Sequence, residues 1–264
     1  MTATGSPDAV AFRQVSKSYG GHVALEPLTL TIPAGERVSL IGHNGSGKTT
    51  LLQLIAGRID PSAGDVSVAG HDPHDRAARA AVSHLADQPV FYDDLSVWEH
   101  LEFVARLHAT VDWVDHASWL VEMLGLTERV DDLPVTFSRG LQQKAALALG
   151  FVRPFDVLLI DEPFVGLDRR GRAALLELLD WAHGDGATVV VATHELASVR
   201  AGSRLIALAD GRLTFDGAPD EADVDALADG DVSSDVAETG GGETDGGESG
   251  DAGPSGDEST VDRE

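Results

Sequence analysis

The segment with the clearest chemistry runs from Gly42 to Thr49 and has the sequence GHNGSGKT. It fits the pattern G-x-x-x-x-G-K-[ST], follows the apolar run VSLI and precedes TTLLQLIAG, which has helical periodicity. Glycines allow successive backbone N–H groups to curl around an anionic phosphate, and the start of a helix adds its dipole. In this pattern Lys48 reaches the terminal phosphates and the Thr49 hydroxyl coordinates Mg²⁺. We therefore predict a phosphate-binding loop, whose members are Gly42, His43, Asn44, Gly45, Ser46, Gly47, Lys48, Thr49 and Thr50.

A second candidate is VLLIDE, residues 157–162, an apolar run that ends in two acidic residues. Short unbroken apolar runs are typical of parallel strands covered on both faces, and α/β folds bind ligands at the carboxyl edge of such strands. There Asp161 suits the water shell of Mg²⁺, and Glu162 suits a base that polarises an attacking water. The alternative is a pair that only faces solvent, but a phosphate loop in the same chain favours phosphoryl transfer.

The rest of the chain must position these groups, and residues 8–217 alternate between strand and helix signals. Between about residues 94 and 153 only helical periodicity remains, which predicts an all-helical insertion in an α/β core. The predicted strands are 10–15, 28–32, 37–41, 65–68, 82–86, 157–161, 188–192, 204–209 and 212–215. The predicted helices are 48–56, 97–108, 113–124, 139–151 and 169–182.

Composition excludes several classes of protein. The 264 residues include no cysteine, which excludes a disulfide scaffold, a thiolate metal site and a cysteine nucleophile. The net charge of −25 disfavours non-specific binding to nucleic acid or to anionic lipid, because both need a cationic face. No apolar run reaches the roughly 18–20 residues that cross a bilayer, and the N-terminus does not resemble a signal peptide. We therefore expect a soluble intracellular protein, with any membrane spans on another chain.

The C-terminal segment differs from the rest in composition. Residues 216–264 carry 17 of the 44 acidic residues and one basic residue, Arg263. Such a Gly-rich, acidic segment buries too little apolar surface to offset its chain entropy, so residues 218–264 are predicted to be a disordered tail. Two alternatives are a regulatory or docking role and a short helix at 221–228. The acid excess, with Arg preferred over Lys, resembles proteins of salt-loving microbes.

Taken in order, the motifs of residues 9–217 resemble the ATP-binding subunit of an ABC transporter. Tyr19, in VSKSYGGHVAL, matches the aromatic residue that stacks on adenine. Gln88, in LADQPVFYDDLSV, matches the Q-loop glutamine, which contacts Mg²⁺ and the attacking water. DEPFVGLD supplies the two acids and then the D-loop, which ends at Asp168. His194, in VVVATHE, matches the switch histidine that contacts the γ-phosphate.

The family signature, typically L-S-G-G-Q, has its best match at residues 137–141, F-S-R-G-L. Ser138 and Gly140 are kept, and the resemblance implies that their hydroxyl and N–H groups touch a γ-phosphate across a dimer. Arg139 and Leu141 replace the first Gly and the Gln. S-R-G forms, and the segment DDLSVWEHLEFVARLHA, resemble members of the drug- and haem-exporter branch.

The resemblance implies an α/β P-loop NTPase of ABC ATPase type, with an antiparallel β subdomain and an α-helical subdomain at about 94–153. It implies ATP as ligand, Mg²⁺ held by Thr49, Gln88 and Asp161, and hydrolysis by Glu162 and His194. The expected partners are a second copy or a paralogous ATP-binding subunit and an integral membrane permease, which holds the chain at the cytoplasmic face. No nucleic-acid partner is expected.

Two other functions stay open: a non-transport ABC ATPase and a regulatory subunit with a weakened ATP site. The first usually has two ATP-binding units or a long coiled coil, and neither is present here. The altered signature is the one feature that favours the second, while Glu162 and His194 argue against it.

Overall fold

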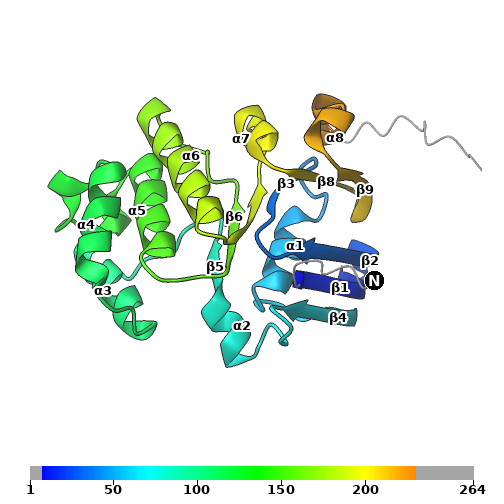
Figure 1. Cartoon of the computed structure of the whole chain (residues 1–264), viewed down its shortest axis with the longest axis horizontal. Coiled ribbons are helices and arrows are strands. Elements are labelled where there is room, and N and C mark those ends of the chain that lie inside the picture. The colour runs from blue at the N-terminus through cyan, green and yellow to red at the C-terminus, as the bar shows by residue number, and fades with distance from the viewer. Residues whose placement is uncertain (1–7, 230–264) are drawn as a thin grey trace, which may run out of the picture. The chain divides into compact units, whose positions relative to one another are not determined.

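The computed structural model describes residues 8–229, which belong to one compact unit (Figure 1). Its strands, helices and short 3-10 helices (η) are, in chain order, β1 Asp8–Tyr19, β2 His22–Pro33, β3 Arg37–Ile41, α1 Lys48–Ile55, β4 Ala63–Val68, α2 Arg76–Ala81, β5 Val82–Leu85, α3 Val97–Leu107, α4 Trp113–Met123, η1 Thr127–Arg129, η2 Pro134–Thr136, α5 Arg139–Phe151, β6 Val157–Asp161, α6 Arg169–Gly184, β7 Thr188–Ala192, α7 Leu196–Ala201, β8 Arg204–Ala209, β9 Arg212–Gly217, η3 Pro219–Glu221 and α8 Val224–Asp229. All the predicted strands and helices are present; α2 and α7 were not predicted.

The larger sheet has six strands in the order β5-β6-β7-β3-β8-β9. All neighbours are parallel except β9, which pairs with β8 in the antiparallel direction. The carboxyl ends of β5, β6, β7 and β3 therefore meet at one edge, where ligands of α/β sheets bind. The segments that follow these four strands contain Gln88, Glu162, His194 and the phosphate loop.

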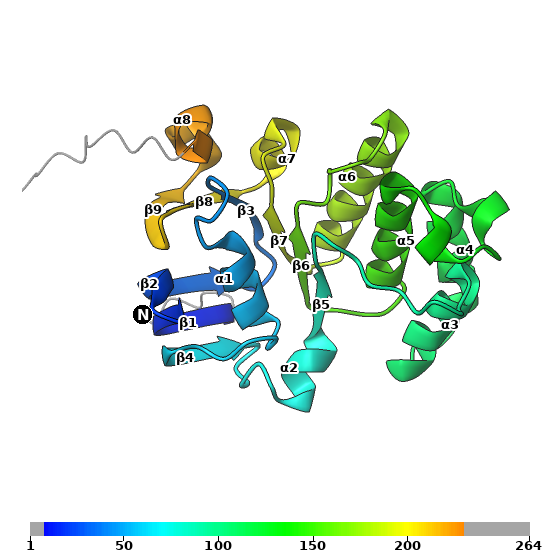
Figure 2. The same ribbon diagram turned by 180° about the vertical axis from the view of Figure 1, so that it is seen from behind.

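Alternate residues of the central strands pack on opposite faces of this sheet, which explains their unbroken apolar runs. Leu158 and Ile160 of β6 belong to the core beneath α3, α4, α5 and α6. Val157 and Leu159 belong to the core that contains α1 and the smaller sheet. This smaller sheet is antiparallel, in the order β2-β1-β4, and α1 lies between it and the larger sheet (Figure 2).

Helices α3, α4 and α5 occupy the stretch predicted to be all-helical. Helix α3 begins with a capping box, in which the Ser96 side chain accepts from the Glu99 N–H and the Glu99 side chain accepts from the Ser96 N–H. Apolar residues of the three helices, such as Leu101, Leu120 and Leu147, are fully buried in one core with α6. No helix in residues 8–229 is both long enough and apolar enough to cross a membrane.

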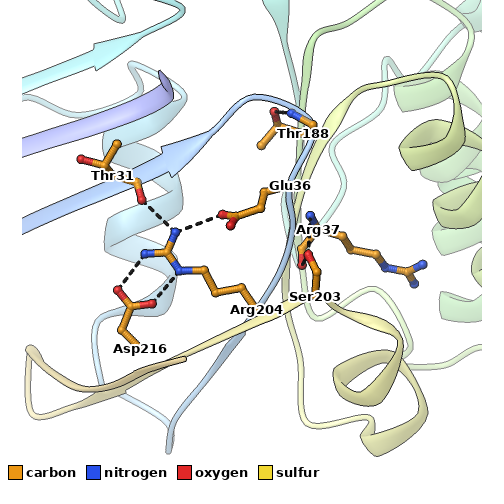
Figure 3. Close-up of polar contacts among 8 residues, drawn as sticks. Thr31, Glu36, Arg37, Thr188, Ser203, Arg204 and Asp216 are labelled. Carbon is orange, nitrogen blue, oxygen red and sulfur yellow. Dashed lines mark hydrogen bonds and ion pairs between the residues drawn. The ribbon is translucent and has the colours of Figure 1, made fainter. Parts of the chain in front are cut away.

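At the amino ends of the parallel strands, an arginine joins the two sheets (Figure 3). Arg204, which begins β8, donates to both carboxylate oxygens of Asp216 in β9, at 2.5 and 2.7 Å. Its Nη1 also donates to Glu36, at 3.0 Å, and to the Thr31 carbonyl of β2, at 2.9 Å. Arg204 and Asp216 lie on the larger sheet, and Glu36 lies in the loop before β3. Because Thr31 lies on β2 of the smaller sheet, its contact with Arg204 connects the two sheets.

The C-terminal prediction needs a correction. The sequence predicts disorder from residue 218, with a short helix at 221–228 as an alternative. Residues 219–229 form η3 and α8, so the alternative describes this part of the chain. Ala222, Val224 and Leu227 pack on a cluster formed by Ile41, Val199, Leu205 and Ala207. These three apolar side chains bury enough surface to order this part of the chain. The average composition of residues 218–264 does not reveal them, because the rest of the segment is acidic and Gly-rich. The rest of the predicted tail, 230–264, lies outside the described residues.

Candidate functional site

The phosphate loop connects β3 to α1, as predicted. Gly42, Gly45 and Gly47 have φ values of 143°, 87° and 108°, which glycine adopts without strain. A Cβ atom at Gly42 would overlap the carbonyl oxygen of Leu208, so the loop needs glycine there on two grounds. The hydroxyl of Ser46 is fully buried and has no hydrogen-bond partner among the described residues. A polar atom left unpaired in such a loop fits a site built for an anion.

Lys48 begins α1, and its ammonium group lies inside the loop. Nζ donates to the carbonyls of Gly42, at 2.5 Å, and His43, at 3.1 Å. The residue is only 6 % exposed, and this burial lowers the pKa of Lys48, while Glu162 and Asp161 act in the opposite direction. A buried cation held by carbonyl groups and facing two acids can exchange these partners for phosphate oxygens.

The two strand-end acids lie beside this loop. Asp161 ends β6, and its Oδ2 accepts from the Thr49 hydroxyl at 2.6 Å, so the two predicted metal ligands touch. Glu162 follows with φ 47°, and its N–H donates to the Ala192 carbonyl of β7 at 2.8 Å. Burial is the main cause that raises the pKa of Glu162 to about 7; Lys48 lowers it, and Asp161 and Asp87 raise it further. Glu162 Oε1 lies 3.1 Å from His194 Nε2.

One cavity of about 390 Å³ collects most of the predicted residues. Those that line it are Tyr19, Asn44, Gly45, Ser46, Gly47, Lys48, Thr49, Thr50, Asp161 and Glu162. Tyr19 is 45 % exposed, as a side chain that stacks on a flat ring needs to be. Three lining residues, His22, Ala24 and Asp87, were not predicted. Gln88 does not line the cavity and is exposed; Asp87, one residue earlier, takes that place.

The signature and D-loop residues lie elsewhere. Ser138 is the N-cap of α5, and Gly140 packs so closely on the Gly166 carbonyl that a Cβ atom would overlap it. Asp168 is the N-cap of α6, where it accepts from the Gly171 N–H at 2.7 Å and pairs with Lys144 at 3.1 Å. The Gly171 hydrogen bond is the main reason why the pKa of Asp168 is lowered. None of Ser138, Gly140 and Asp168 lines the cavity.

Comparison with known proteins identifies the family. Residues 25–165, more than half of the chain, match the family described as ABC transporter. The chain belongs to the ABC transporter family. Among curated ABC proteins, it is 32 % identical to the SkfA peptide export ATP-binding protein SkfE of Bacillus subtilis, over 77 % of this chain and 87 % of that one. It is also 32 % identical to the uncharacterised ABC transporter ATP-binding protein YdbJ of B. subtilis, over 70 % of this chain and 61 % of that one.

Solved ABC structures agree with the fold. One described as the ATP-binding subunit of an ABC transporter has a TM-score of 0.76 and 28 % identity, covering 81 % of this chain and 91 % of that one. Another, an ATP-binding cassette in a post-hydrolysis state with ADP and Pi, has a TM-score of 0.73 and 27 % identity, covering 80 % and 98 %. The predicted fold, ABC-type ATPase class and ATP-binding character are therefore confirmed.

Within this ABC chain, the metal prediction can be tested against geometry. No three His, Cys, Asp or Glu side chains in residues 8–229 converge closely enough to hold a metal ion on their own. Mg²⁺ usually binds through one or two carboxylates together with phosphate oxygens and water. Thr49 and Asp161 are in contact beside the phosphate loop, so they can supply the few protein ligands that such a site needs. Gln88 is exposed and does not line the cavity, so its contact with the metal stays a prediction.

Proposed function

We propose that this chain is the ATP-binding and ATP-hydrolysing subunit of an ABC exporter and drives a separate membrane subunit. The observation that carries the proposal is the single cavity that joins Tyr19, the phosphate loop, Asp161 and Glu162. The export direction is supported by relatives named for peptide export and for Nod factor export; the latter, from Burkholderia lata, is 32 % identical over 87 % of this chain and 75 % of that one.

In this proposal the chain contributes placement and charge. Tyr19 stacks on the base, while Lys48 and the loop N–H groups hold the phosphates. Thr49 and Asp161 hold Mg²⁺, which neutralises charge on the phosphate oxygens when it is bound. Glu162 orients the attacking water and accepts its proton, and His194 holds the γ-phosphate end.

The signature supports a face-to-face dimer. Ser138 and Gly140 do not line the ATP cavity of their own chain, so they are available to a second ATP-binding subunit, either a copy or a paralogue. We place the chain at the cytoplasmic face of the membrane, held there by a permease. We also propose a salt-rich cell as its origin, because 44 acidic residues face 19 basic ones.

The experiment measures ATP turnover with Mg²⁺ in molar salt for the parent, Lys48→Ala and Arg79→Ala. Arg79 is an exposed cation of α2 outside the cavity, so it controls for the loss of a positive charge. We expect Lys48→Ala to lose about 100-fold or more and Arg79→Ala to match the parent. Unchanged turnover in Lys48→Ala would overturn the proposed site.

A second experiment tests the dimer and the membrane partner. Glu162→Gln keeps the shape but cannot accept a proton, so ATP should accumulate in a dimer that size-exclusion chromatography detects. Turnover that rises in vesicles containing the permease supports transport. Turnover indifferent to any permease supports a non-transport ABC ATPase, and ATP binding without turnover supports a regulatory subunit.

A further inference from the structure

The nucleotide cavity has a third acidic lining residue besides Asp161 and Glu162. Asp87 follows β5 by two residues and lines the cavity together with Lys48, Thr49, Asp161 and Glu162. Its side chain is 38 % exposed, so it can meet both the cavity and solvent. Its neighbour Gln88 is exposed and stays outside the cavity.

Asp87 is also tied to the signature of its own chain. Arg139 Nη2 lies 3.2 Å from Asp87 Oδ1 and donates a hydrogen bond to it. Arg139 is the first residue of α5, and its Cγ packs against Gly166 of the D-loop, where a Cβ atom would lie at 3.4 Å. Arg139, one of the two residues that depart from the usual signature, thus spans from the D-loop to an acid of the ATP cavity.

The charges around the cavity give the contact between Asp87 and Arg139 an electrostatic consequence. Three carboxylates line it, those of Asp87, Asp161 and Glu162, and Lys48 is its one lining Lys or Arg. Asp161 bonds to Thr49 and Glu162 contacts His194, both within the predicted site. The partner of Asp87 is an arginine, Arg139, and like His194 it is not a lining residue of the cavity. A nucleotide brings further negative charge, which Asp87 repels unless a divalent cation lies between them.

We propose that Asp87 is a positioning residue for the metal-bound nucleotide. Arg139 sets how much of the negative charge of Asp87 acts on the cavity. The proposal rests on the proposed function. Asp87 would hold part of the water shell of the cation, and its charge penalises a nucleotide that arrives without the cation. Arg139 reduces that penalty, because it neutralises part of the Asp87 charge from outside the cavity.

The test measures ADP affinity by calorimetry, in EDTA and in excess Mg²⁺, at matched high salt. The readout is the gain in ADP affinity on adding Mg²⁺, which needs no turnover. We expect Asp87→Asn to reduce this gain about tenfold and Arg139→Gln to increase it about threefold. The double variant should match Asp87→Asn alone, because Arg139 acts only through Asp87.

Asp93→Asn is the matched control, since it removes an exposed carboxylate of the same segment that does not line the cavity. Asp87→Glu, which keeps the charge, should retain most of the gain, and the thermal midpoint of each variant shows that it is folded. An unchanged gain in Asp87→Asn, or a loss in Gln88→Ala instead, would overturn the inference. A parent chain that binds no ADP in either condition would overturn the proposed function itself.

Discussion

His194 Nε2 lies 3.1 Å from Glu162 Oε1, although the two residues are 32 positions apart in the chain. They meet because β6 and β7 are parallel neighbours, so both side chains leave the same edge of the sheet. Glu162 is held by a hydrogen bond from its own N–H to Ala192, the last residue of β7. The pairing of two strands thus sets the positions of Glu162, the proposed base, and His194, the proposed switch histidine.

This relationship predicts how turnover depends on pH. Burial raises the pKa of Glu162 to about 7, so below that pH the nucleotide-free chain holds the proton that a base must lack. We expect kcat/KM to rise with pH and level off above about 7, because it reports the free enzyme. Steady-state rates from pH 5.5 to 9 check this. A profile that is flat across pH 7 would contradict the assignment of Glu162 as the base.

Gly140→Ala tests the close packing of the signature. A Cβ atom there would overlap the Gly166 carbonyl, so the start of α5 and the D-loop must move apart. We expect a loss of about 1–3 kcal/mol in the free energy of unfolding and a larger loss in turnover than in ATP affinity. Gly184→Ala is the control, because nothing lies within 4 Å of a Cβ atom at that position of α6. Equal stability in the two variants would argue against the overlap.

Two truncations separate α8 from the tail. Removal of residues 218–264 exposes the cluster that α8 covers, and we expect the thermal midpoint to fall by about 5–15 °C. Removal of 230–264 leaves that cluster covered and should leave the midpoint nearly unchanged. Thermal unfolding at matched high salt measures both. If both truncations gave the same midpoint, the packing of α8 would add no stability.

Arg204→Gln tests the junction between the sheets (Figure 3). Asp216 and Glu36 would each lose a charged partner, and we expect a loss of about 1–3 kcal/mol in the free energy of unfolding. Arg212→Gln is the control on the same hairpin, since its exposed pair with Glu26 spans 3.7 Å and contributes about 0–1 kcal/mol. Urea unfolding measures both, and equal losses would argue that the Arg204 network adds nothing special.

Local patterns were enough to predict the parts of the site that lie on one segment. GHNGSGKT carries its glycines, its Lys and the start of its helix within a few residues, and VLLIDE carries its strand and its acids together. The central strands at 157–161 and 188–192 are equally clear, because covering on both faces makes their runs almost wholly apolar. These features depend only on residues that are close together in the chain, so one sequence is enough to predict them.

Features that depend on contact between distant segments could not be predicted in this way. In LADQPV, two adjacent polar residues follow the strand, and nothing local says which one faces the cavity. Asp87 takes that place in the fold and pairs with Arg139, 52 residues away. The sequence offers a short helix at 221–228 only as an alternative to disorder, because the few apolar residues of α8 matter only where a cluster on β3, β8 and α7 receives them.

The placement of the four tryptophans gives the chain its own optical reporter. Trp98, Trp113 and Trp119 lie on α3 and α4, and Trp181 lies on α6, where its ring is 5.8 Å from that of Trp119. His116 is stacked on Trp119 at 5.4 Å and lies 5.5 Å from Trp181. None of the four lines the nucleotide cavity, whose aromatic ring is Tyr19. A change in tryptophan emission when nucleotide binds therefore registers movement of α3, α4 or α6, and not the arrival of the base.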